Sequence, residues 1–137
     1  MPNLDPSVNQ NNDYDDTTTK TINKFENHLL SIRAERQEMI HPNSHPTYNE
    51  RQQKIIEIID WTLEKYNAAV NTQNMNEQNE QVIIDNIIEE LDKRRDIAIH
   101  KKKQALLKDE MLKYGEEEDT IDYIIFIIRE GIGKLYH

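Results

Sequence analysis

Apolar residues recur along most of the chain at alternating spacings of three and four, which places them on one side of an α-helix. In the first such segment, residues 21–40, they are Ile22, Phe25, Leu29, Ile32 and Met39. Arg36 occupies one position of the same series. Pro42 and Pro46 follow, and a proline disfavours helical geometry in the residue before it. The pattern predicts a first helix over residues 21–40 and a turn before residue 47.

A second, more hydrophobic helix is predicted from Thr47 to about residue 70. Thr47 is a suitable N-cap, and Glu50 three residues later completes a capping-box pattern. The apolar positions are Ile55, Ile56, Ile58, Ile59, Trp61, Leu63, Tyr66 and Val70. Because this apolar arc is the widest in the chain, we expect the second helix to be central. Residues 71–79 are almost entirely polar and predict a loop.

The third segment, from about residue 76 to 114, keeps a helical pattern without any glycine or proline. A continuous helix here would be about 50 Å long at 1.5 Å per residue, and Gly115 would end it as a C′ glycine. A bend near His100 is the alternative. A neighbouring helix of about 20 residues covers only about 30 Å of such a helix. We therefore predict that a partner protein or a second copy covers its distal apolar positions, which are Ile99, Leu106, Met111 and Tyr114.

The last apolar segment, Ile121 to Ile128, is ambiguous between strand and helix. Its β-branched and aromatic residues favour a strand, whereas Asp119 or Thr120 would cap a helix. No second segment is a candidate for pairing with a strand, so we predict a helix. The predicted fold is all-α, with three to four amphipathic helices in a hairpin bundle or an extended, coiled-coil-like arrangement. One helical domain is expected over residues 20–137, after a disordered acidic tail over residues 1–19.

Charge is distributed unevenly along a chain whose net charge is -9. Residues 93–113 contain eight Lys or Arg against three acids, which gives +5 locally. Arg94, Lys101 and Lys108 recur every seven residues, with Arg95 and Lys102 beside them, which makes a positive stripe on the predicted helix. Of these we include Arg94, Arg95, Lys101 and Lys102 among the candidate partner-binding residues. The stripe could bind an acidic protein or a nucleic acid, but charge runs more often form a solvated face or pair with acidic helices of the same chain. We favour the interpretation that the run forms a solvated face or pairs with acidic helices of the same chain.

A nucleic-acid-associated protein using residues 93–113 is the alternative function. The net negative charge argues against it, because attraction to phosphates needs a positive surface. No aromatic residue is interspersed in the basic run, which argues against stacking on single strands. Nucleic acid is therefore not the expected partner.

Recognisable catalytic chemistry is absent from the sequence. The chain has no Cys, which removes disulfides, thiolate nucleophiles and Cys-based zinc sites. His41 and His45 lie in a proline-containing turn, and two ligands are too few for a zinc site. Carboxylates one helical turn apart, such as Asp60 and Glu64, lack the Glu-x-x-His in a core stripe that di-iron bundles require. No phosphate-binding glycine loop or nucleophile elbow occurs. We expect no enzyme activity, no cofactor and no metal.

The sequence also predicts a cytoplasmic protein. Residues 1–10 lack the basic and apolar regions of a signal peptide, and the densest apolar run, Ile124 to Ile128, is far shorter than the about 20 residues of a membrane span. No membrane association is expected.

The acidic run Glu116 to Asp119 stands within the last 22 residues, ahead of a hydrophobic end that contains Leu135. This arrangement, together with the Asn-, Lys- and Ile-rich composition, resembles bacterial effectors delivered by the Dot/Icm type IV secretion system. The resemblance concerns the C-terminal segment and composition, not a fold family, and the run lies farther from the end than in most such effectors. It implies entry into a host cell by a non-classical route. The expected function is a non-catalytic, protein-binding regulator: an inhibitor, an adaptor, or a small effector or effector-regulator.

Overall fold

The structure is a computed structural model that describes residues 24–72 and 76–136. Its regular elements in this part of the chain are all α-helices, with no strand. They are a helix over residues 24–38, α2 (Pro46–Val70), α3 (Glu77–Gln104) and α4 (Lys108–Tyr136). The predicted all-α fold is thereby confirmed, and so is the helical state of residues 121–128. The predicted acidic tail over residues 1–19 lies outside the described residues.

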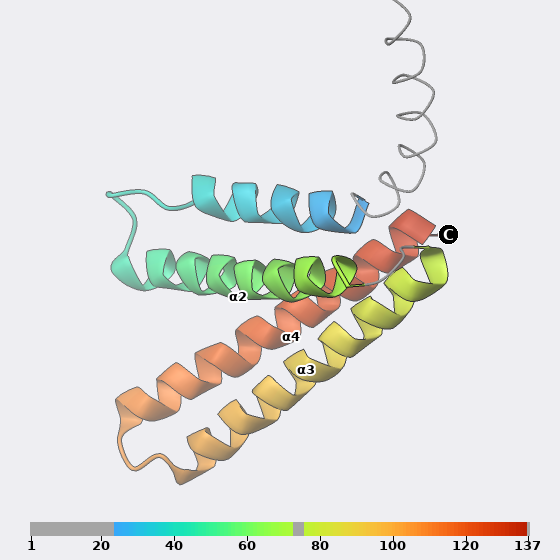
Figure 1. Ribbon diagram of the computed structural model, residues 1–137. Helices are drawn as coiled ribbons and strands as arrows, with labels where there is room; N and C mark the ends of the chain where they lie inside the picture. Colours follow the sequence, from blue (N-terminus) through green and yellow to red (C-terminus); the bar gives the residue numbers. More distant parts are fainter. Residues whose placement is uncertain (1–23, 73–75, 137) are drawn as a thin grey trace, which may run out of the picture.

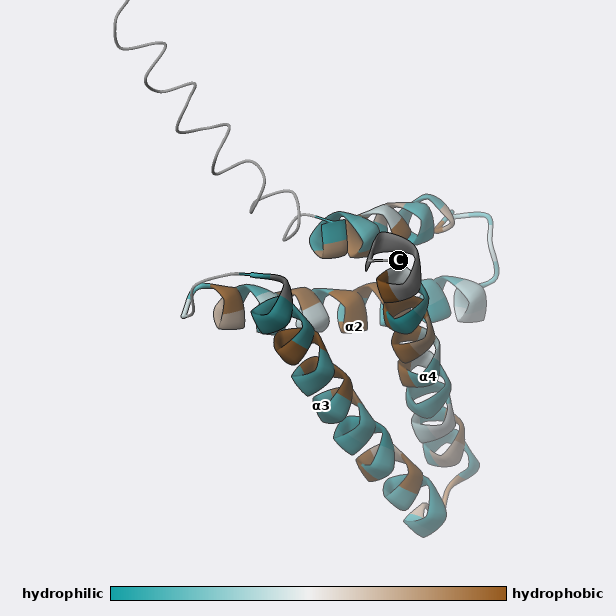
Figure 2. Cartoon of the chain, turned by 90° about the vertical axis from the view of Figure 1, so that its right-hand side faces the viewer, coloured by the Kyte–Doolittle hydropathy of each residue, from teal (hydrophilic) through white to brown (hydrophobic). Residues whose placement is uncertain are grey.

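The four helices form two antiparallel pairs (Figure 1). The 24–38 helix runs beside α2, and α3 and α4 form a long hairpin that crosses this first pair. The connection between α3 and α4 closes the hairpin at an end that points away from the 24–38 helix (Figures 1 and 2).

A single cluster of apolar side chains holds the two pairs together. Its members from α2, α3 and α4 recur at the spacing of one helix face, as the sequence pattern predicts. The cluster consists of Phe25 and Leu29 of the 24–38 helix together with Ile55, Ile58, Ile59, Leu63, Tyr66, Ile83, Ile84, Ile87, Ile88, Leu91, Ile121, Ile124, Ile125, Ile127 and Ile128. The segment that was ambiguous in the sequence thus supplies the face of α4 that packs into the core.

The continuous helix over residues 76–114, which the sequence left open against a bend near His100, does not form, because the chain turns at residues 105–107. Ala105 ends α3 with φ -66° and ψ 134°, an extended conformation open to any L-residue, so the turn needs neither glycine nor proline. Lysines occupy the last turn of α3, and Asp109 and Glu110 the first turn of α4, which suits both helix dipoles. Turning here lets α4 pack Ile121 to Ile128 against α3, which a straight helix would not do.

The predicted N-cap of the second helix is also corrected. α2 begins at Pro46, and the preceding His45 caps it by accepting a hydrogen bond from the Thr47 backbone N–H on Nδ1 at 3.1 Å. Proline suits the first position of a helix, since its φ is already helical and its missing N–H would be unsatisfied there in any case. Thr47 is therefore inside the helix.

Gly115 lies inside α4 and not at a helix end, which leads to a stability prediction. A Cβ at this position would meet Lys102 Cδ at 3.5 Å, an ordinary contact. Because alanine is the better helix former, Gly115→Ala should raise the free energy of unfolding by about 0.5–1 kcal/mol in urea denaturation.

Gly131→Ala in the same helix is the matched control. Its Cβ would lie 2.6 Å from His28 Cδ2, and the His28 ring is held by a 3.1 Å hydrogen bond between Nε2 and the Ile127 carbonyl. We expect Gly131→Ala to be less stable than Gly115→Ala. A destabilised Gly115→Ala would instead indicate that this glycine terminates a helix.

Candidate functional site

The basic stripe predicted from the sequence is divided by the turn: Lys108 begins α4, and the other members lie on α3, where three of them pair with acids of α4. Arg94 donates to Glu117 Oε1 at 3.1 Å, and Arg95 donates to Asp122 Oδ1 at 2.7 Å. Lys102 donates to Glu118 Oε1 at 2.8 Å. These contacts recur along the hairpin and fix α4 against α3.

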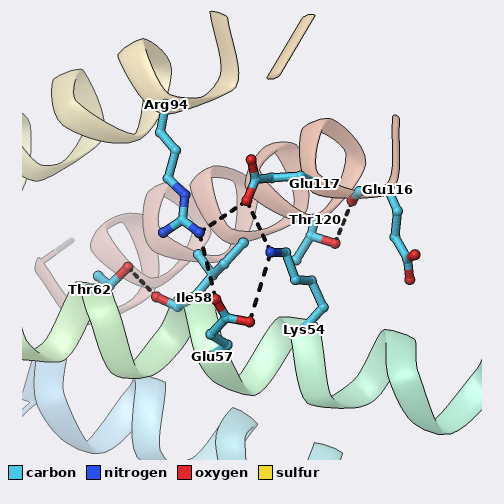
Figure 3. Close-up of polar contacts among 8 residues, drawn as sticks. All are labelled: Lys54, Glu57, Ile58, Thr62, Arg94, Glu116, Glu117 and Thr120. Atoms are coloured by element: carbon cyan, nitrogen blue, oxygen red, sulfur yellow. Dashed lines mark hydrogen bonds and ion pairs between the residues drawn. The ribbon is translucent and has the colours of Figure 1, made fainter. Parts of the chain in front are cut away.

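The contacts of Arg94 belong to a cluster that joins three helices (Figure 3). Glu117 of α4 accepts hydrogen bonds from Arg94 of α3 and from Lys54 of α2, the latter at 3.0 Å. Glu57 of α2 lies 3.8 Å from Lys54 and 3.9 Å from Arg94. The Arg94 guanidinium also lies 5.6 Å from the ring centroid of Trp61, which adds a cation–π contact.

The ion pairs shift the pKa values of Glu117 and Lys102. Burial raises the pKa of Glu117, but the hydrogen bonds and charges of Lys54 and Arg94 outweigh burial, so the net pKa is below the ordinary carboxyl value. The hydrogen bond with Glu118 raises the pKa of Lys102. Both directions favour the charged forms, as expected for groups whose charges hold the hairpin together.

The structure separates the four apolar residues predicted as a binding stripe. Ile99 and Tyr114 are partly buried within the hairpin, whereas Leu106 is 95% exposed and Met111 47% exposed near its closed end. Because the chain turns at residues 105–107, these residues do not form one face of a continuous helix.

Two residues that were not predicted as site residues complete an apolar surface at this end. Leu107 is 63% exposed and Leu112 is 62% exposed. We define the tip patch as Leu106, Leu107, Met111 and Leu112; its first two residues form the hydrophobic-coloured connection between α3 and α4 in Figure 2. The sequence did contain a signal for the turn: basic residues at 101–103 and acidic residues at 109–110 flank residues 105–107, the charge order typical of one helix ending and another beginning.

A groove of about 860 Å³ continues from the tip patch, between α4 and the first turns of α2. Its apolar lining includes Met111 and Leu112 of the tip patch together with Ile55 and Tyr123. Arg36 lies at its side, donating to Gln52 Oε1 at 3.2 Å and to the Tyr123 hydroxyl at 2.5 Å. Arg36, which occupies one position in the apolar series of the first helix, thus fixes Gln52 and Tyr123 beside the groove through its hydrogen bonds.

Lys101 differs from the other predicted stripe residues. Its Nζ lies 5.7 Å from the centroid of the Tyr114 ring, and Lys113 Nζ of α4 lies 5.9 Å from the same ring. Both helices of the hairpin therefore contribute a lysine near this ring.

Within residues 24–72 and 76–136, no group of three or more His, Cys, Asp or Glu side chains could hold a metal ion. No helix in the same part is long and apolar enough to cross a membrane.

Comparison with known proteins adds no further constraint on the site. No protein-family model, no curated protein and no solved structure matches this chain.

Proposed function

We propose that this protein is a non-catalytic regulator that binds another protein through the tip patch and the adjoining groove. The observation that carries this proposal is the exposure of four large apolar side chains within seven residues, at the closed end of a helical hairpin. Burial of apolar surface contributes about 25 cal/mol per Å², and clustered exposed apolar side chains commonly mark interfaces.

The construction of the hairpin supports a binding role. Ion pairs between α3 and α4 hold it in one conformation before any partner arrives. A preorganised surface loses less conformational entropy on binding than a flexible one, so more of the contact energy contributes to affinity. Inhibitors, adaptors and effector-regulators all act by such binding, and the resemblance to Dot/Icm effectors would make a host or effector protein the partner.

Replacing Leu106 and Met111 with aspartate is expected to abolish partner binding while the protein stays folded. The double change puts two charges into the tip patch, but both side chains are exposed, so unfolding free energy should change by about 0.5 kcal/mol or less per site. Affinity capture from native lysate with mass spectrometry measures binding, and circular dichroism measures folding.

The matched control is Val82→Asp with Ile97→Asp, the same chemical change at exposed positions of α3 outside the tip patch. The control should recover the same proteins as the wild type. Equal recovery by the tip variant would contradict the proposal. Recovery that nuclease treatment removes would favour the nucleic-acid alternative, which the pairing of Arg94, Arg95 and Lys102 argues against.

A second copy of the chain is one form that the partner can take. Light scattering of the purified protein separates this case from a different protein. A mass above the 16.3 kDa of one chain, which returns to 16.3 kDa in the tip variant, indicates self-association through the same surface. A monomer in both samples assigns the surface to a different protein.

A further inference from the structure

Four lysines close to the tip patch along the chain form no ion pair with the described residues. Lys101, Lys103, Lys108 and Lys113 are all exposed, and no carboxylate of the described residues lies within ion-pair distance of any of them. Lys102, by contrast, is bound to Glu118. Of the basic segment, the residues nearest the closed end are thus the ones that remain available.

The local charge at this end opposes that of the whole chain. Residues 100–113 contain five lysines against Asp109 and Glu110, which gives +3 in a chain of net charge -9. Lys101 of α3 and Lys113 of α4 each lie near the Tyr114 ring, so both helices of the hairpin contribute lysines to this end. A negatively charged partner would be attracted to this locally positive end.

From this complementarity we propose that the occupant of the tip patch and groove is an acidic amphipathic helix of another protein. Its apolar side chains contact Leu106, Leu107, Met111 and Leu112, and its carboxylates lie against the four lysines that form no ion pair with the described residues. The inference rests on the proposed function and specifies the chemistry of its partner. Amphipathic helices binding in hydrophobic grooves, with anchors at positions i, i+3, i+4 and i+7, are a recurring mode of recognition.

The shape of the surface favours a helix over an anionic lipid bilayer. The patch continues into a groove of about 860 Å³ lined mainly by α2 and α4, with Arg36 and Lys102 at its sides, a concavity that a helix can enter and a flat bilayer cannot.

Selection from a displayed library of random 18-residue helical peptides, about 27 Å long at 1.5 Å per residue, tests the proposal with the full chain as the target. The peptides should carry apolar residues at helical spacing and no imposed net charge. We expect the enriched peptides to have an excess of Asp and Glu on the flanks of the apolar stripe. Their affinity, measured by fluorescence anisotropy, should fall as salt rises, because the lysines are exposed.

Reversing the charge of lysines near the tip patch separates the acidic-helix proposal from the broader proposal that the tip patch binds a protein. Lys103→Glu with Lys108→Glu should weaken the enriched peptides about five- to tenfold, given a few tenths to 1 kcal/mol for each exposed pair. Lys65→Glu with Lys93→Glu changes net charge equally away from the closed end and should weaken them less than twofold.

Each remaining outcome overturns the acidic-helix proposal. Enriched peptides that lack an excess of acidic residues, or whose binding is unaffected by the Lys103/Lys108 reversal, contradict it. If such peptides still lose binding to the Leu106→Asp, Met111→Asp variant, the proposed function stands and only the acidic-helix proposal fails. Absence of any peptide that depends on the tip patch would overturn both proposals. Co-sedimentation with phosphatidylserine vesicles, in the absence of such peptides, would assign the lysines to a lipid surface.

Discussion

Replacing Ile124 with alanine is expected to lower the free energy of unfolding by about 2–5 kcal/mol, the usual result of truncating a fully buried isoleucine. The Ile124 side chain has 0% exposure and packs in the cluster that joins the two helix pairs. Phe126→Ala, two residues along the same helix, should cost about 0.5 kcal/mol or less, since Phe126 is 61% exposed. In a domain of this size the first change should lower the melting temperature by about 10 °C or more.

The pair also tests the helical state of residues 121–128 directly. In a strand, residues 124 and 126 would share a face and the two substitutions would have similar effects. In a helix they are about 200° apart, so one faces the core and the other faces solvent. Urea denaturation followed by circular dichroism measures both free energies. Similar losses for the two variants would contradict the structure.

The helices were predictable from the sequence because each carries one apolar face with a period near 3.6. Phe25 and Leu29, Ile59 and Leu63, and Ile84 and Ile88 are buried at that spacing. The turn at residues 105–107 was not predictable from glycine and proline alone, since Ala105 adopts an extended backbone that any residue can take. What determines this turn is tertiary packing of α4 on α3, together with the charges at the two helix ends.

The candidate site was predictable only in part, for the same reason. Leu106 and Met111 were assigned to a stripe on one long helix, and they lie at the end of a hairpin instead. Arg94, Arg95, Lys101 and Lys102 all lie on α3, but periodicity could not tell which of these residues meet a carboxylate. Lys102 reaches Glu118 because the antiparallel register of α4 places it there, whereas Lys103 faces solvent.

Replacing Glu117 with glutamine is the second substitution for which we expect a large effect. Glutamine keeps the shape of the side chain and removes the charge that Lys54 and Arg94 share, which leaves two cations facing each other. Hydrogen bonds to charged groups contribute about 1.5–3 kcal/mol each, but Lys54 and Arg94 are 25% exposed and Glu57 is nearby. We therefore expect a loss of about 1–3 kcal/mol in total at pH 7.

Glu57→Gln is the matched control for this prediction, because it removes a charge from the same cluster. Glu57 is 62% exposed and lies 3.8 Å or more from both cations, so its loss should cost about 0.5 kcal/mol or less. Urea denaturation at pH 7 compares the two variants. Equal losses would show that overall charge matters, and not the position of Glu117 between α2, α3 and α4.

The stability difference between wild type and Glu117→Gln should also shrink as pH falls. The pKa of Glu117 in the folded protein is lowered from its ordinary value of 4.5, so the unfolded chain takes up the proton at a higher pH than the folded chain does. The stabilisation from charged Glu117 is therefore fully present above pH 4.5 and is lost as pH falls through 4.5 and then through the lower folded pKa. Using the difference between the two proteins cancels the protonation of the other carboxylates. A difference that stays constant from pH 7 down to about pH 3, well below the ordinary carboxyl range, would mean that the substitution acts through packing and not through the charge of Glu117.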